Sequence, residues 1–210
     1  SVEVFFDEGT GSAAEWGSTG RVFISKYVNR SNTDIYEYYL DGEKIYGMPT
    51  PKLRESDRLT KNSAIETEPA LSPDGRYLAL ISDRTGSPQV YVRDMQRKKL
   101  TRITENGNYN VSPSWSPDGK FIAYASRRSG VSSIYRIDPK SKEENRVTPK
   151  NMNAESPTWS PDGSMIAFSG KKGGDWKIYY SLSSGGQAVR LTNSKVGLQE
   201  TMPSWGPSLR

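Results

Sequence analysis

Residues 113–124 read Pro-Ser-Trp-Ser-Pro-Asp-Gly-Lys-Phe-Ile-Ala-Tyr, and this stretch decides the fold because close copies of it recur along the chain. The Ser-Pro-Asp-Gly motif stands at residues 72–75, 116–119 and 160–163, a step of 44 residues each time. A period of about 40–45 residues is typical of a β-propeller, in which each repeat forms one four-stranded blade. The period therefore predicts an all-β protein built from blades.

The repeat at residues 110–148 shows how one blade is built. A first short strand carries Trp115. Pro-Asp-Gly then turns the chain, because Pro presets φ, Asp hydrogen-bonds its own backbone and Gly accepts a positive φ. Residues 121–125 are nearly all apolar, as expected of a strand covered on both faces by neighbouring blades. Residues 134–137 and 145–148 follow as a third and an outer strand, so each repeat predicts four antiparallel strands.

Four blades can be assigned from this template. Three complete blades are predicted at about residues 66–104, 110–148 and 154–192. Residues 20–60 supply the last three strands of a further blade, and residues 199–210 contain an isolated first strand, since residues 203–207 read Pro-Ser-Trp-Gly-Pro. The sequence therefore predicts a propeller domain at residues 20–210 with an N-terminal extension at residues 1–19.

The incomplete repeats near the two ends of the sequence predict a closed ring. The C-terminal strand lacks the remainder of a blade, and the N-terminal segment lacks a first strand. We therefore predict that residues 203–206 pair beside residues 21–25. This pairing would complete the fourth blade and leave no long unpaired sheet edge.

Two recurring residue types are interpreted as structural. The aspartates of the Pro-Asp-Gly turns are expected to form turns rather than to bind a metal; they are Asp74, Asp118 and Asp162. The tryptophans two residues before the turn proline are expected to pack between blades; they are Trp115, Trp159 and Trp205, with Leu71 at the equivalent place in another repeat.

The composition excludes several kinds of chemistry. The 210 residues include no His and no Cys, so a Ser-His-Asp triad, a cysteine nucleophile and a zinc site with His or Cys ligands are all excluded within this chain. The net charge of +5 is spread along the sequence, which argues against nucleic-acid binding. No stretch approaches 18 consecutive apolar residues, so no membrane insertion is expected.

The repeat motifs resemble those of the TolB propeller family. Pro-x-Trp-Ser-Pro-Asp-Gly is followed by Ile-Ala-Phe or Ile-Ala-Tyr, then by Ile-Tyr and by a hydrophobic residue before Thr, over residues 113–148 and 157–192. Residues 202–207 are similar to the end of TolB propellers. The resemblance covers residues 20–210 and implies a WD-type propeller. The family pattern has six blades and an added α/β domain, whereas this sequence shows four blades and no such domain.

The resemblance implies a non-enzymatic scaffold of the bacterial cell envelope, periplasmic or exported. It implies a protein or peptide partner, for which a peptidoglycan-associated lipoprotein of the Tol-Pal system is a candidate. Two alternatives remain open. One is the substrate-gating propeller of a serine peptidase whose triad lies in another domain, and the other is a fragment of a larger TolB propeller.

A partner-docking face is predicted around the central channel. In a propeller, the loops before each innermost strand share one face with the loops between the second and third strands. Acidic and amide groups of the first set would lie near the axis, inside a ring of basic groups from the second set. The candidate residues are Glu66, Glu68, Asn110, Glu155, Glu200, Arg84, Arg128 and Lys172.

No cofactor is assigned to this face, although carboxylates at the channel mouth could hold a cation such as calcium. Charge reversal at Arg84 and Arg128 is expected to weaken partner binding and to leave stability unchanged, as for exposed loop residues.

Overall fold

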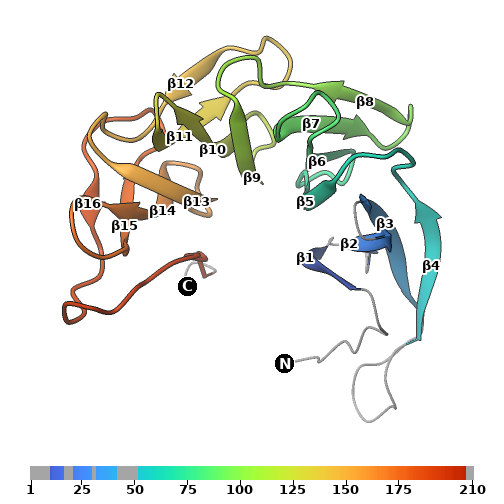
Figure 1. Ribbon diagram of the computed structural model, residues 1–210, viewed down its shortest axis with the longest axis horizontal. Helices are drawn as coiled ribbons and strands as arrows, with labels where there is room; N and C mark the ends of the chain where they lie inside the picture. Colours follow the sequence, from blue (N-terminus) through green and yellow to red (C-terminus); the bar gives the residue numbers. More distant parts are fainter. Residues whose placement is uncertain (1–9, 17–20, 30–31, 42–51, 207–210) are drawn as a thin grey trace.

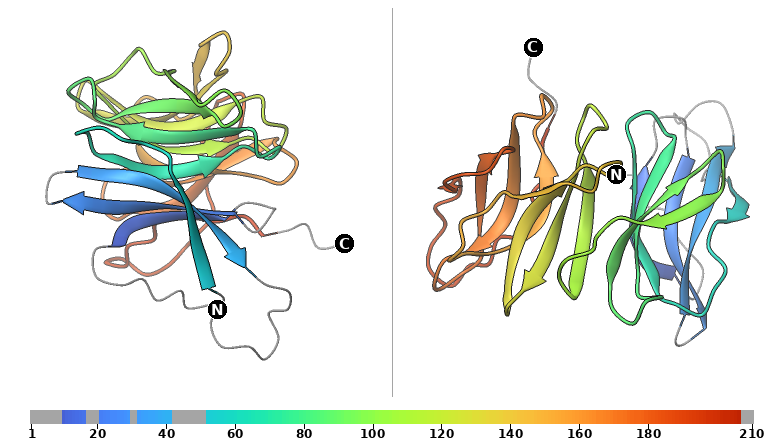
Figure 2. Two further views of the ribbon diagram at one scale, coloured as in Figure 1. Left: turned by 90° about the vertical axis from the view of Figure 1, so that its right-hand side faces the viewer. Right: turned by 90° about the horizontal axis from the view of Figure 1, so that it is seen from above.

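The computed structural model describes residues 10–16, 21–29, 32–41 and 52–206, and the statements below concern these residues. They form sixteen β-strands and no helix, arranged as four antiparallel sheets of four strands. The sheets stand side by side along an arc, and their innermost strands face its centre (Figure 1). Figure 2 shows the same sheets from two further directions. The prediction of an all-β protein made of four-stranded antiparallel sheets is confirmed.

The strands of each sheet follow the chain order from the centre of the arc outward. The first sheet contains β1 (Thr10–Trp16), β2 (Arg21–Asn29), β3 (Asn32–Asp41) and β4 (Lys52–Arg58). The second contains β5 (Glu66–Leu71), β6 (Tyr77–Ser82), β7 (Gln89–Asp94) and β8 (Lys99–Arg102). The third contains β9 (Tyr109–Trp115), β10 (Ile122–Arg128), β11 (Val131–Ile137) and β12 (Glu144–Arg146). The fourth contains β13 (Asn153–Trp159), β14 (Met165–Lys171), β15 (Lys177–Leu182) and β16 (Val189–Arg190).

The predicted closure of the ring is corrected, because β1 occupies the edge of β2 that the C-terminal strand was expected to fill. Trp16 pairs with Val22, in the same register as Trp115 with Ile122. The prediction that residues 203–206 pair beside residues 21–25 is therefore wrong. Part of the predicted N-terminal extension serves as an innermost strand, and the described residues form an open arc.

The C-terminal segment instead packs against the fourth sheet. The indole Nε1 of Trp205 donates to the carbonyl oxygen of Thr158 at 3.2 Å. Trp115 and Trp159 make the same bond to the preceding sheet, to Ala70 at 3.0 Å and Ser114 at 2.9 Å. Strands β5, β9 and β13 also share a residue with positive φ, as does the C-terminal segment; these are Glu68 at 51°, Ser112 at 55°, Ser156 at 54° and Met202 at 56°. Residues 199–206 thus take the place of an innermost strand that follows the fourth sheet.

The apolar core lies between neighbouring sheets. Between the second and third sheets, Trp115 packs with buried side chains that include Val92, Ile103 and Tyr124. Between the third and fourth sheets, Trp159 packs with Phe168 and other buried residues. The interpretation of these two tryptophans as inter-blade core is confirmed, since Trp115 is 9% exposed and Trp159 is 7% exposed.

The Pro-Asp-Gly turns are held by their own side chains. The Oδ1 atom of Asp118 accepts hydrogen bonds from the Ser116 hydroxyl at 2.7 Å and from the Lys120 backbone N–H at 3.1 Å. Gly119 has φ of 68°, which is why glycine stands there. Asp74 and Asp162 make the equivalent bonds in their own turns. The interpretation of these aspartates as turn residues is confirmed.

Candidate functional site

The predicted site residues lie at one end of the sheets, which we call the loop face. It comprises the beginnings of β5, β9 and β13, residues 199–200, and the connections that follow β6, β10 and β14. The Pro-Asp-Gly turns lie at the other end, which we call the turn face. Because consecutive strands are antiparallel, residues far apart in sequence meet at the loop face.

Glu66 and Arg84 form an ion pair within the second sheet. The Glu66 side chain is fully buried, and its Oε1 atom also accepts hydrogen bonds from Asn62 at 2.8 Å and Ser82 at 3.1 Å. The Arg84 guanidinium lies over the Tyr91 ring, 5.3 Å from its centroid. The structure therefore brings these two predicted residues together, as a pair that secures the connection after β6.

Asn110 takes the position in the third sheet that Glu66 takes in the second. Glu66 pairs with Ser82 across β5 and β6, and Asn110 pairs with Ser126 across β9 and β10. The buried Asn110 amide donates to Gln89 Oε1 at 2.7 Å and to the Asn106 carbonyl at 3.0 Å. These bonds fix the loop before β9.

Arg128 is engaged by a carboxylate on the outer strand of its own sheet. It donates two hydrogen bonds to Glu144, at 2.7 and 2.9 Å, and lies 3.7 Å from the centroid of the Tyr135 ring. The Tyr124 hydroxyl donates to the same carboxylate at 2.5 Å. Burial alone would raise the pKa of Glu144, but the hydrogen bonds from Arg128 and Tyr124 outweigh it and hold that pKa below its usual value.

Glu200 lies beside a buried lysine. Its Oε2 atom accepts from the Thr192 hydroxyl at 2.6 Å and lies 3.7 Å from Lys177 Nζ. Lys177 is 5% exposed and also donates to the carbonyl of Leu198 at 2.6 Å. Lys172, in contrast, is exposed in the connection that follows β14.

Glu68 and Glu155 line one cavity of about 320 Å³ at the inner strands of the loop face. Tyr109, Arg127 and Ser132 also line the cavity, so three sheets contribute to it. Burial raises the pKa of Glu68, although the N–H of Ser112, which donates to Glu68 Oε2 at 2.7 Å, opposes that shift. The Arg127 guanidinium lies over the ring of Tyr109, 5.3 Å from its centroid.

Sequence reasoning missed Tyr109, Arg127 and Lys177. None of the three recurs at the 44-residue step, so the repeat gave no reason to select them. An inner-strand aromatic residue beside a basic residue on the neighbouring strand would have been the signal, since Tyr109 pairs with Arg127 across β9 and β10.

Within the described residues, no group of three or more acidic side chains lies close enough to hold a metal ion. Those residues also contain no helix that is long and apolar enough to cross a membrane.

Sheets of this kind, built from a 44-residue repeat and packed around a common centre, define a β-propeller domain. The chain belongs to the family described as the TolB beta propeller domain, whose model matches residues 25–209. A curated relative, the Tol-Pal system protein TolB of Bordetella pertussis, is 50% identical over 34 residues, which is 16% of this chain and 8% of that protein.

Solved structures with the same fold include two TolB proteins. TolB from Acinetobacter baumannii aligns with a TM-score of 0.69 and 22% identity over 90% of this chain, which spans 45% of that structure. A putative TolB from Agrobacterium tumefaciens aligns with a TM-score of 0.69 and 23% identity over 94% of this chain and 73% of its own. A puromycin hydrolase aligns less closely, with a TM-score of 0.62, 16% identity and 32% of its own chain covered.

Proposed function

We propose that this chain is a non-enzymatic scaffold that docks a protein or peptide partner on the loop face. The observation that carries the proposal is the cavity around Glu68 and Glu155, where groups from three sheets converge beside a partly exposed tyrosine. Tyr and Arg are the residue types most often found at the energetic centres of interfaces. Tyr109 and Arg127 therefore suit a partner contact.

In this proposal the predicted site residues fall into two groups with different roles. Contact with the partner is assigned to Glu68, Glu155 and Lys172, together with Tyr109 and Arg127. Support of the loops that carry those contacts is assigned to Glu66, Arg84, Asn110, Arg128 and Glu200. The division follows from the ion pairs and hydrogen bonds of the second group.

A peptidoglycan-associated lipoprotein is the partner we propose, in a periplasmic or exported setting, because TolB relatives carry the Tol-Pal name. Action within a larger TolB-type propeller is an alternative that the position of Trp205 favours, since it matches the inner strand of a following blade. A peptidase-gating role has weaker support, because the hydrolase resembles this chain less closely than TolB does. The scaffold role predicts no turnover of esters, peptides or glycosides by the purified chain.

The test is calorimetry with a purified peptidoglycan-associated lipoprotein from the same source. The double variant Tyr109→Ala, Arg127→Glu should weaken binding by about tenfold or more. The exposed control Gln187→Lys, beside β16, should bind like the unaltered chain. Equal affinity of the double variant and the unaltered chain would refute docking at this cavity.

A further inference from the structure

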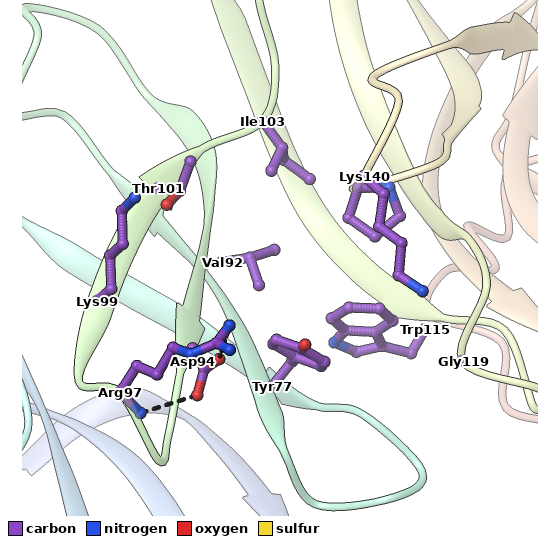
Figure 3. A pocket seen from close by; sticks show the side chains of 11 residues that line it. Tyr77, Val92, Asp94, Arg97, Lys99, Thr101, Ile103, Trp115, Gly119 and Lys140 are labelled. Atoms are coloured by element: carbon purple, nitrogen blue, oxygen red, sulfur yellow. Dashed lines mark hydrogen bonds and ion pairs between the residues drawn. The ribbon is translucent and has the colours of Figure 1, made fainter.

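A second concave site lies on the turn face, between the second and third sheets. It is a cleft of about 230 Å³ whose floor is formed by the rings of Tyr77 and Trp115 (Figure 3). These rings are stacked, with centroids 6.3 Å apart and planes inclined by 28°. Val92 and Ile103 add aliphatic surface to the walls. The cleft therefore offers one apolar, partly aromatic surface to a ligand.

Three basic side chains surround this apolar floor, namely Arg97, Lys99 and Lys140. The one carboxylate in the lining, Asp94, is already engaged. It accepts the backbone N–H groups of Gln96 and Arg97 and lies 3.7 Å from the guanidinium groups of Arg76 and Arg97. The two lysines are exposed, so the rim presents net positive charge to solvent.

The equivalent positions at the other two sheet interfaces carry charged side chains. Val92 pairs with Ala79, as Arg136 pairs with Ala123 in the third sheet and Glu37 with Phe23 in the first. Arg136 covers the Phe121 ring at 4.6 Å from its centroid.

In the first sheet, Glu37 forms an ion pair with Arg21. The small side chain of Val92 therefore leaves the Tyr77 ring uncovered toward the cleft between the second and third sheets. At the next interface a cavity of about 330 Å³ is also present, but there Arg136 lies over the aromatic ring of Phe121.

We propose that this cleft binds an acidic peptide segment of a protein partner, with one aromatic or large aliphatic side chain as its anchor. A volume of about 230 Å³ is below the roughly 300–1,000 Å³ of sites for drug-sized molecules and suits a single large side chain. An aromatic anchor would pack against Tyr77 and Trp115, and neighbouring Asp or Glu residues would pair with Lys99 and Lys140.

The surroundings of the cleft favour a peptide over a small acid. A hollow of about 720 Å³ adjoins it and shares Tyr77, Gly119 and Lys140 with it. The residues on either side of an anchor would have room to continue along this hollow, whose three aspartates are matched in number by three basic side chains. Since the cleft lies at the opposite end of the sheets from Glu68 and Glu155, the inference is independent of docking on the loop face.

The test is selection of random decapeptides displayed on phage, carried out in parallel on the unaltered chain and on Val92→Arg. This variant copies Arg136 and should cover the Tyr77 ring as Arg136 covers Phe121. The unaltered chain should enrich peptides with an aromatic or large aliphatic residue flanked by Asp or Glu. Those peptides should bind Val92→Arg about tenfold more weakly or worse.

Three further variants separate loss of the cleft from loss of the fold. The double variant Lys99→Glu, Lys140→Glu leaves the apolar floor intact and should also weaken binding of the selected peptides. Gln187→Lys, at an exposed position beside β16, should leave their affinity unchanged, and so should Tyr109→Ala with Arg127→Glu on the loop face. Enrichment of peptides without this pattern would overturn the proposal. So would selected peptides that bind Val92→Arg and the lysine double variant as tightly as they bind the unaltered chain.

Discussion

At the scale of single residues, the ion pairs of the loop face determine which of its charged side chains stabilise the fold. Arg84 neutralises Glu66, whose carboxylate is fully buried, so reversing Arg84 would place two carboxylates together without a cation. We expect Arg84→Glu to lower the free energy of unfolding by about 2–3 kcal/mol, less than the roughly 3–5 kcal/mol of a fully buried pair, because the Arg84 side chain is 34% exposed. Lys172→Glu, at an exposed position, should change it by less than about 0.5 kcal/mol.

Urea unfolding of the two variants measures this difference. Equal stability of Arg84→Glu and Lys172→Glu would contradict the assignment of Arg84 to loop support. It would restore the expectation from sequence, in which both residues belong to one exposed basic ring and neither contributes to folding.

The Glu144 carboxylate should make stability depend on pH. Its pKa in the folded chain is held below its usual value, so its contribution is fully present above the unfolded pKa of about 4.3 and is lost as pH falls through the folded pKa. Replacing Glu144 with Gln removes charge-assisted bonds to Arg128, at a cost of about 1–3 kcal/mol near neutral pH.

The measurement is urea unfolding of the unaltered chain and of Glu144→Gln between pH 7 and pH 3. The stability difference between the two proteins should be largest at pH 7 and should shrink below about pH 4. A difference that stays constant over this range would show that ionisation of Glu144 does not stabilise the fold.

The sequence could predict residues whose role is local and could not predict those whose partners lie across strands. Asp118 bonds atoms within two residues of itself, so the motif alone revealed its role. Arg128 and Glu144 are 16 residues apart, and nothing in the repeat indicates that their side chains point toward each other. For that reason the sequence did not predict that Arg84 and Arg128, two members of the predicted basic ring, form ion pairs within single sheets, whereas Lys172 is exposed.

At the scale of strands, the tryptophan of β9, of β13 and of the C-terminal segment attaches it to the preceding sheet through a hydrogen bond from the indole N–H. Trp159 is buried between two sheets, whereas Trp205 in the C-terminal segment is only half-buried. We expect Trp159→Ala to cost about 3–5 kcal/mol, as for other buried aromatic residues, and Trp205→Ala to cost clearly less.

Chemical unfolding of both variants tests this ranking. If Trp205→Ala destabilises the chain as much as Trp159→Ala does, the C-terminal segment is a full part of the core, and its description as an added inner strand on the fourth sheet would be wrong.

Strand β1 shows why one element escaped the sequence analysis. Trp16 stands six residues before its partner Val22, while Trp115 stands seven before Ile122. The intervening residues 17–20 read Gly-Ser-Thr-Gly, without the Pro-Asp-Gly turn that marks the other repeats. The Pro-Asp-Gly motif therefore does not predict this strand, although its tryptophan indicates it, and the C-terminal strand is predicted in its place.

At the scale of the molecule, the repeat was sufficient to predict the fold class. It was insufficient to predict whether the ring of sheets closes. A period specifies the blade, because each repeat forms the same four strands. Closure depends on which strand meets the edge of β2, and two segments, residues 10–16 and 203–206, carry the same Trp marker. The family match follows from the repeat, whereas residues that every repeat shares identify no partner.

The central claim is that a protein partner docks on the loop face, and hydrogen–deuterium exchange of the chain with and without a peptidoglycan-associated lipoprotein tests it most directly. We predict slower exchange on binding at residues 107–112, 127–131 and 153–156, with little change in the Pro-Asp-Gly turns. Protection confined to residues 72–76 and 116–120 on the turn face, or no protection in a complex proven to form, would contradict the claim.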